Sequence, residues 1–302
     1  MSIPSHTSLA NPGAPMLPGP VAGTRRPAIA FPPLACDCHA HVFGEPDEFP
    51  YAPDASYRVP PATLDDYERM LGAIGCARGV LVQPSVYGTD NACMLDALSR
   101  RPANLRGVAV VDPGIGDAEL EALHAAGVRG IRINVSSETA GLRLEDAPRL
   151  AARIRPLGWH LQFFVRVDQA HDLADRLASL PVPCVIDHFG QVAASGGAQS
   201  PGARRLLELA RLEHIWFKLM GAYRVSSLAP HYRDVRPLAR GLIEAAAERC
   251  VWATDWPHPN AVPMPDDGDL ADCLGDWTSA GDVLQRILVD NPARLYGFGN
   301  AA

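Results

Sequence analysis

The 302-residue sequence has no long apolar run and no excess of positive charge, and these two absences exclude several classes of protein. No stretch reaches the roughly 18 consecutive apolar residues that a membrane-spanning helix needs, so we expect no membrane partner. The 27 lysines and arginines are outnumbered by 34 acidic residues, and without a basic patch we expect no nucleic-acid partner. The composition, 47% hydrophobic and 20% charged, is that of an ordinary globular protein.

The sequence also lacks a disulfide framework. Its seven cysteines are odd in number, scattered along the chain and set mostly in apolar stretches. This usage predicts buried free thiols in a reducing compartment, and we therefore expect a cytoplasmic protein. Cys36 and Cys38 form a C-x-C motif, but a zinc knuckle would need a second cysteine pair nearby, which the sequence does not have.

The first 33 residues differ from the rest because they are rich in Pro, Gly, Ala and Ser. This composition predicts a disordered or surface-wrapping leader (residues 1–33), followed by one domain over residues 34–302. Arg25-Arg26 is not read as a twin-arginine signal, because no apolar segment follows it. We expect a monomer or a small homo-oligomer.

Short apolar segments alternate with longer amphipathic ones along the domain. Eight segments have the near-continuous hydrophobicity of parallel strands: 35–43, 78–84, 106–111, 129–135, 160–166, 184–189, 215–220 and 250–255. Eight helical patterns accompany them: 63–76, 91–101, 117–126, 146–157, 168–179, 201–213, 232–248 and 280–289. Eight such cycles predict an α/β fold, a single (β/α)8 TIM barrel. An open doubly wound sheet is the alternative, but no G-x-G-x-x-G follows the first strand.

Polar and ionisable side chains gather at the ends of these predicted strands. They are His39, His41, Arg132, Asp187, His188, Lys218, Tyr223, Arg224, Asp255 and His258. The C-terminal strand ends of a barrel meet on one face, and burying so many polar groups without a purpose would be costly. We therefore predict an active site on this face, shaped by the long inserts at 44–62 and 256–279.

Histidines spaced H-x-H together with a late aspartate are compatible with a metal site. In that alternative, a zinc-dependent hydrolase or decarboxylase would use as ligands His39, His41, His188 and Asp255. The fifth predicted strand, however, offers no ligand before Arg166, and Arg132 on the fourth is a cation that would repel a metal. We therefore favour a site without a cofactor, with Zn²⁺ as the alternative.

A metal-free hydrolytic site needs a base for water and donors for the developing oxyanion. Asp255 is the predicted general base, because the end of a buried strand allows its pKa to be tuned. The groups predicted to polarise a carbonyl oxygen are His39, His41 and His188.

Further residues of this face are predicted to bind substrate. Arg132, Arg224 and Lys218 are surplus cations, and the arginine fork predicts a carboxylate-bearing small molecule. Tyr87, after the second strand, is predicted either to bond substrate or to pack against a loop. His258 is predicted either to contact substrate or to orient the loop that follows Asp255.

Seven stretches, in order along residues 35–297, carry a family signature: Asp37–Gly44, Phe49–Pro53, Val82–Asn91, Gly127–Asn134, Asp187–Gly190, Trp252–Asn260 and Leu288–Tyr296. Together they resemble the amidohydrolase superfamily, in the branch that includes 2-pyrone-4,6-dicarboxylate lactonase. The resemblance implies a (β/α)8 barrel that hydrolyses a lactone ester without a divalent metal, with Asp255 as the base. It also implies that Arg132 and Arg224 hold substrate carboxylates.

Two departures from the family pattern concern the substrate. The branch has a second carboxylate-binding arginine after strand four, where this chain reads Val135-Ser-Ser-Glu-Thr139, and a tyrosine on strand five, where it has Phe164. Arg143 and Arg166 are candidates to compensate. A lactone with one carboxylate fewer, or a differently placed one, is therefore expected, in the breakdown of aromatic compounds. The remaining alternative, a binding protein on a degraded barrel, is disfavoured because the histidines and Asp255 are intact.

Overall fold

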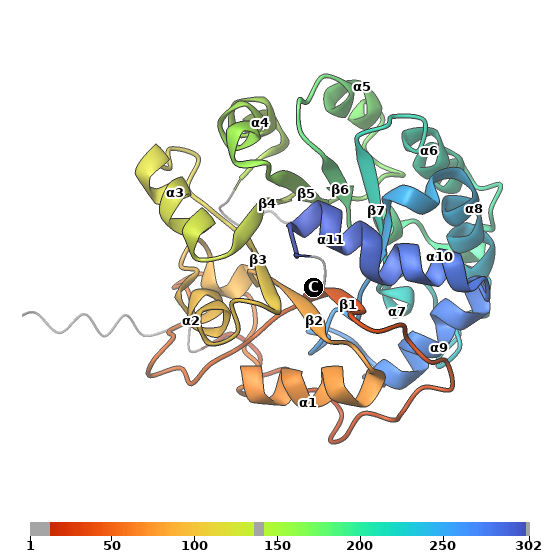
Figure 1. The fold of residues 1–302 in the computed structure, drawn as a ribbon, viewed down its shortest axis with the longest axis horizontal. Helices are drawn as coiled ribbons and strands as arrows, with labels where there is room; N and C mark the ends of the chain where they lie inside the picture. Colours follow the sequence, from red (N-terminus) through yellow and green to blue (C-terminus); the bar gives the residue numbers. More distant parts are fainter. Residues whose placement is uncertain (1–12, 136–141, 300–302) are drawn as a thin grey trace, which may run out of the picture.

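The eight apolar segments form eight parallel strands that pair in chain order in a computed structural model (Figure 1). The structure describes residues 13–135 and 142–299. The strands are β1 (Cys36–Ala40), β2 (Arg78–Val82), β3 (Leu105–Ala109), β4 (Val128–Asn134), β5 (His160–Phe164), β6 (Cys184–Ile186), β7 (Ile215–Leu219) and β8 (Cys250–Trp252). Most of their side chains are buried, as expected for strands covered on both faces.

The last strand returns to the first and makes a barrel. Ala40 forms a parallel bridge with Trp256, and the backbone N–H of His41 donates to Trp256 O at 2.7 Å. This closure confirms the predicted (β/α)8 barrel and excludes the open sheet, whose edge strands would stay apart.

Helices surround the barrel between successive strands (Figure 1). The longer ones are α1 (Leu64–Ile74), α2 (Ala92–Arg100), α3 (Asp117–Ala125), α4 (Ala147–Ile154), α6 (Pro201–Leu209), α8 (Arg236–Ala246) and α9 (Asp267–Trp277). The shorter ones are α5 (Leu173–Ala178), α7 (Ala222–Val225), α10 (Gly281–Gln285) and α11 (Asn291–Tyr296).

The insert at 256–279 was expected to be a loop, and α9 within it is the main difference from the sequence prediction. Asp266 caps this helix by accepting a hydrogen bond from the backbone N–H of Gly268 at 2.8 Å. Asp267 and Asp269 lie in its first turn, where acidic side chains stabilise the helix dipole. Acidic residues at this start and the apolar positions that follow were local signals of a helix.

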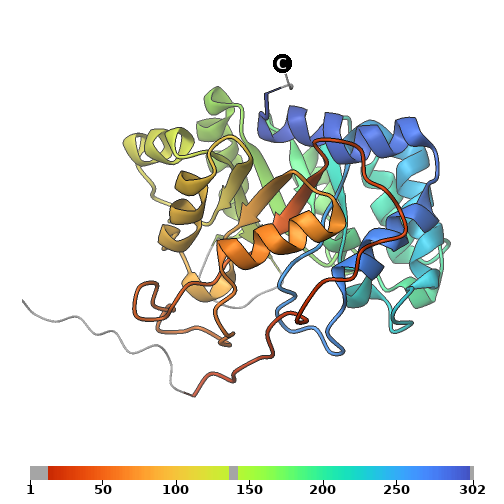
Figure 2. The ribbon, with the colours of Figure 1, turned by 60° about the horizontal axis from the view of Figure 1, so that its bottom comes forward.

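The part of the leader that the structure describes, residues 13–33, runs along the outside of the barrel (Figure 2). Leu17 donates its backbone N–H to Arg58 O at 2.7 Å, and Arg25 forms ion pairs with Asp269 and Asp272 of α9. The leader is thus attached to both long inserts. The boundary at residue 33 stays a prediction.

All seven cysteines are free and buried, as their sequence context predicted. Within residues 13–135 and 142–299, no helix is long and apolar enough to cross a membrane.

Candidate active site

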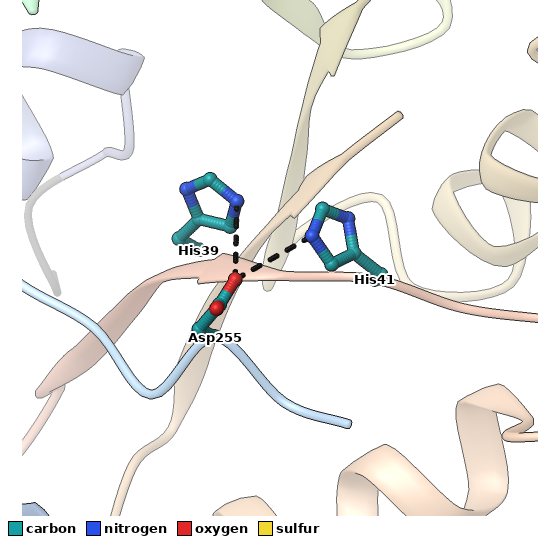
Figure 3. A group of neighbouring side chains, drawn as sticks. All are labelled: His39, His41 and Asp255. Atoms are coloured by element: carbon teal, nitrogen blue, oxygen red, sulfur yellow. Dashed lines mark ion pairs between the residues drawn. The ribbon is translucent and has the colours of Figure 1, made fainter. Parts of the chain in front are cut away.

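The junction of β1 and β8 brings three predicted site residues together (Figure 3). The backbone N–H of Asp255 donates to His39 O at 2.9 Å, which fixes the aspartate beside the H-x-H pair. Nε2 of His39 lies 3.7 Å from Asp255 Oδ1, and Nε2 of His41 lies 3.5 Å from the same oxygen. The imidazole of the β1 residue His39 and that of His41, directly after β1, therefore face one carboxylate oxygen, as the period-two geometry predicted.

A second buried carboxylate, that of Asp37, links β1 to the segment after β8 by hydrogen bonds. Its Oδ1 accepts from the backbone N–H groups of Thr254 and His39, and its Oδ2 accepts from the hydroxyls of Thr254 and Tyr67. Burial raises the pKa of Asp37 to about 6, although these four hydrogen bonds oppose the shift. The sequence analysis did not select Asp37, because its partner lies more than two hundred residues away.

The two oxygens of Asp255 have different surroundings. Oδ2 accepts from Arg224 Nε at 2.8 Å and from the Tyr223 hydroxyl, and His188 Nε2 lies 3.2 Å from it. Oδ1 is buried and has no hydrogen-bond partner among the described residues. Burial alone would raise the pKa of Asp255, but Arg224 and then His188 outweigh it and hold that pKa well below its ordinary value. Asp255 is therefore an ionised carboxylate with one oxygen fixed and one oxygen free.

The backbone at these positions is in the left-handed region. Asp255, His188 and His258 have φ angles of 70°, 51° and 62°. Such conformations cost about 1–3 kcal/mol each in non-glycine residues and are concentrated at functional sites. Gly221 has a φ of 68°, and a Cβ there would lie 2.6 Å from His188 Cδ2, so only glycine allows this close approach.

Lys218, predicted to be a substrate-binding cation, is fully buried and lies next to His39. Its Nζ is 2.6 Å from Gln162 Oε1, 3.2 Å from His39 Nδ1 and 3.5 Å from Asp187 Oδ1. Burial would raise the pKa of Asp187, but Lys218 and His39 lower it strongly. Burial and the nearby Lys218 lower the pKa of His39, so this imidazole is neutral near pH 7.

Arg132 lies at the edge of the site, 8% exposed. Its guanidinium stacks 5.2 Å from the ring of Phe164, and its Nε is 3.9 Å from Asp187 Oδ2. The Phe164 ring also meets the His188 ring edge to face at 5.0 Å. Among residues 13–135 and 142–299, the closest polar contact of the Arg132 side chain is Nη1 to Gln83 O at 3.5 Å. A cation held this way is available to an anionic group.

His258 is fully buried, and its Nε2 lies 3.0 Å from Asp267 Oδ1 at the start of α9. Its ring packs edge to face against Tyr223 at 5.5 Å. Of the two predictions made for His258, this geometry favours orientation of the loop, and the role itself stays a prediction.

Tyr87 is buried in an aromatic cluster. Its ring stacks on Tyr51 at 5.3 Å and lies 6.0 Å from the ring of Phe43. This position favours packing against the insert at 44–62 over contact with substrate.

Tyr57, in the same insert, borders the site and was missed by the sequence analysis. It is buried, and Ser85, Arg132 and Arg224 are near enough to its hydroxyl to act against the effect of burial on its pKa. Burial raises its pKa, so it is a phenol and can donate a proton. The long insert was expected to shape the pocket, but no sequence signal singled out this tyrosine.

The spacing of three of the four ligands proposed in the zinc alternative is compatible with a metal ion. Ligand atoms of His39, His41 and Asp255 lie within 4.8 Å of one another. Zn²⁺ takes such N and O ligands at about 2.0–2.2 Å, and as a bound ion it would supply an activated water.

The charges around these atoms do not fit a metal. Arg224 and Tyr223 both donate to Asp255, and the Lys218 ammonium faces the imidazole of His39. Two cations are therefore already paired with the groups that a metal would use, and we derive no chemical step through a metal.

A barrel with an H-x-H pair at its first strand and an aspartate after its eighth defines a hydrolase-type site of the (β/α)8 class. Residues 36–298 match the model of the amidohydrolase family. The chain is 36% identical over 274 residues to a 4-sulfomuconolactone hydrolase of Hydrogenophaga intermedia, which covers 89% of this chain and 90% of the relative. It is 38% identical over 287 residues to a 2-pyrone-4,6-dicarboxylate hydrolase of Comamonas testosteroni, covering 91% and 94%.

A solved structure is also similar, that of a probable 2-pyrone-4,6-dicarboxylic acid hydrolase of Acinetobacter baumannii with citric acid bound. It superposes with a TM-score of 0.78 at 28% identity and covers 88% of this chain and 100% of that one. The chain belongs to the amidohydrolase family, and the resemblance found in the sequence is confirmed.

Proposed function

We propose that this protein hydrolyses a small lactone that carries a carboxylate, without a metal cofactor. One observation carries the proposal: Asp255 Oδ1 is free among the described residues, ionised and faced by two imidazoles, while Oδ2 is fixed by Arg224. The two relatives named above are hydrolases, one of a lactone, and they support the same reaction class.

The free oxygen of Asp255 is the base. Water donates a proton to Oδ1 as its oxygen bonds to the lactone carbonyl carbon, which gives a tetrahedral oxyanion. The imidazoles of His39, His41 and His188 cluster around Asp255, and in this proposal at least one of them donates an N–H to the oxyanion. Collapse breaks the ring C–O bond, and the proton on Asp255 passes to the leaving oxygen, so the product is an open-chain acid.

Arg132 and Arg224 suit an anionic substituent on the lactone. Guanidinium groups form planar pairs with carboxylates, and both arginines are near enough to Tyr57 to influence its pKa. The tricarboxylate citric acid in the Acinetobacter structure and the sulfonated substrate in the name of the Hydrogenophaga relative support anion recognition. Residues 136–139, where the chain lacks the second arginine of the family pattern, lie outside the described residues. The substrate panel therefore includes lactones with different numbers of carboxylates.

Carboxylated lactones of this kind arise when aromatic rings are opened, and we place the protein in such catabolism. Seven buried free cysteines support a reducing compartment, the cytoplasm.

The experiment is a panel of pyrone and muconolactone carboxylates and sulfonates, assayed in H₂¹⁸O with mass detection. We expect one ¹⁸O in the new carboxylate of the product. Asp255→Asn should lower kcat by about 10²–10⁴-fold, the usual contribution of a general base. Asp96→Asn, at an exposed position of α2, is the matched control and should retain full activity. Retained activity in Asp255→Asn would remove the proposed base.

The zinc-dependent alternative is favoured by the ligand spacing alone. Metal analysis of the purified protein and assays after chelation decide between the two. We expect less than one tenth of a metal ion per chain and unchanged kcat after chelation. Loss of activity on chelation, restored by Zn²⁺, would establish the alternative. No turnover on any lactone would favour a binding protein.

A further inference from the structure

The hydrogen-bond partners of Lys218 determine where its three protons point. The ammonium group has three donors and no acceptor. Around its Nζ lie three groups from other parts of the barrel that can accept: Gln162 Oε1 at 2.6 Å and His39 Nδ1 at 3.2 Å, which are hydrogen-bonded to it, and Asp187 Oδ1, which forms an ion pair with it at 3.5 Å. The three N–H donors of Lys218 therefore each have an acceptor only if all three of these atoms accept.

The orientation of Gln162 supports this assignment. Its amide Nε2 donates to Asp187 Oδ2 at 2.8 Å, and a carboxylate oxygen can only accept that bond. The carbonyl Oε1 of the same amide must then face Lys218. The two partners thus assign which amide atom of Gln162 is oxygen and which is nitrogen. A flipped amide would direct its NH₂ group at the Lys218 ammonium, so that two donors would face each other.

His39 is the remaining partner, and its two tautomers differ in their fit. A proton on Nδ1 would point at the ammonium of Lys218, where two donors would meet in a fully buried place. Asp187 Oδ1 lies 3.7 Å from that nitrogen, which is too far for a hydrogen bond to relieve the conflict. We propose that Lys218 is a positioning residue that holds His39 in the tautomer with its proton on Nε2.

His41 is held in the opposite tautomer. Its Nδ1 lies 2.7 Å from Val82 O, and a carbonyl oxygen only accepts, so Nδ1 carries the proton. In this tautomer the Nε2 of His41 is an acceptor, 3.5 Å from Asp255 Oδ1. Two histidines of one H-x-H motif thus present opposite groups to the site, a donor from His39 and an acceptor from His41.

If the protein hydrolyses a lactone as proposed above, the donor of His39 and the acceptor of His41 have different roles in the reaction. The N–H of His39 has no hydrogen-bond partner among the described residues and is free to donate to the lactone carbonyl oxygen. Asp255 Oδ1 and His41 Nε2 are two neighbouring acceptors that suit the two hydrogens of the attacking water. Lys218 therefore acts through His39 and does not itself contact substrate.

The test is ¹⁵N NMR of the histidine side chains in the full-length, ¹⁵N-labelled protein near pH 7.5. Long-range proton–nitrogen correlations distinguish the protonated from the bare ring nitrogen. His39→Gln and His41→Gln identify the two signals. His214, whose Nε2 lies 2.9 Å from Leu177 O far from this site, is an internal standard with its proton on Nε2. We expect the pattern of His39 to match His214 and that of His41 to be its reverse.

Lys218→Met removes the donor that faces His39, so a proton on Nδ1 no longer meets another donor, and a small movement of the ring toward Asp187 Oδ1, 3.7 Å away, would complete a hydrogen bond. We expect the His39 signal to change to the Nδ1–H pattern while the His214 and His41 patterns stay as they were. With an active lactone, kcat should fall at least tenfold while KM stays within threefold. Lys218→Gln, which retains a weaker donor, should give an intermediate fraction of the Nε2–H form.

A His39 signal of the Nδ1–H type in the unaltered protein would overturn the proposal, as would an unchanged His39 pattern in Lys218→Met. The unaltered protein decides the question even if both variants fail to fold. The NMR result does not depend on turnover, so a panel without any hydrolysed lactone would overturn the proposed function and leave the tautomer assignment standing.

Discussion

Arg224 donates from Nε to Asp255 Oδ2 at 2.8 Å, so the proposed base, which is buried, forms an ion pair with a half-buried cation. Arg224 follows β7 and Asp255 follows β8, and the side chains meet because parallel strands end at the same face of the barrel. Arg224 fixes the Asp255 carboxylate and keeps it ionised. Because the pKa of Asp255 is lowered, the carboxylate is also a weaker base.

Arg224→Met should move the acidic limb of the kcat/KM profile upward. Asp255 acts in its ionised form, and in the unaltered protein its pKa lies well below the ordinary value of about 3.9, so the limb lies below that pH. Without the guanidinium, burial dominates and the pKa of Asp255 rises. We expect an upward shift of at least about one pH unit, a loss of about 1.4 kcal/mol of stabilisation of the anion. Arg224→Lys retains the charge and should shift the limb less. The same limb in all three proteins would contradict the assignment.

Arg132→Met should weaken recognition of the anionic substituent. The guanidinium stacks on Phe164, and among the described residues its closest polar contact is 3.5 Å long, so it can form a bidentate pair with a carboxylate. We expect KM for a carboxylated lactone to rise about 10–100-fold, the loss of roughly 1.4–2.8 kcal/mol of binding. A neutral lactone should show less than a threefold change. Arg149→Met on α4, exposed and outside the site, is the control. Equal effects on charged and neutral lactones would argue against anion binding by Arg132.

The buried pair of His258 and Asp267 should show strong thermodynamic coupling. Asp267→Ala leaves a fully buried polar ring without its nearest partner, and we expect a loss of about 1–3 kcal/mol in the free energy of unfolding. The double variant with His258→Ala should lose less than the sum of the single losses by at least about 1 kcal/mol. Urea unfolding measures all four proteins of the cycle.

The exposed pair of Arg101 and Glu68 is the matched control. Its side chains are 48% and 34% exposed, so Glu68→Ala should cost less than about 1 kcal/mol. Additive losses at His258 and Asp267 would show that the pair does not hold the loop after Asp255.

His160 should contribute to acid destabilisation. Its imidazole is fully buried, and burial, followed by the charge of Lys218, lowers its pKa to about 3. The unfolded chain has a pKa near 6.5 for this group, so the stability is present above pH 6.5 and is lost as the pH falls toward 3. For this group alone, the free energy of unfolding should fall by about 2 kcal/mol between pH 6.5 and pH 5.

His160→Gln removes this titration. Urea unfolding between pH 5 and pH 7 should give a smaller slope for His160→Gln than for the unaltered protein, whatever its absolute stability. His171→Gln, at an exposed position, should leave the slope unchanged. Equal slopes for His160→Gln and the unaltered protein would refute the prediction.

The sequence by itself determined the architecture and most of the residues of the site. Apolar segments with amphipathic ones between them are local patterns, and eight repeats of them leave few folds other than the barrel. The H-x-H spacing placed His39 and His41 on one face, because alternation along a strand is also local. The family signature then pointed to Asp255 and to the reaction class.

Only the tertiary structure decided which role each of these residues has in the site. Contacts such as Thr254 with Asp37, or Lys218 with His39, join residues about two hundred positions apart, and their distances follow from barrel closure and packing. No local pattern shows that Lys218 is buried beneath an imidazole, or that Tyr57 reaches the site from an irregular insert. Hydrogen-bond partners assign the tautomers of His39 and His41, and those partners come together only when the strands do.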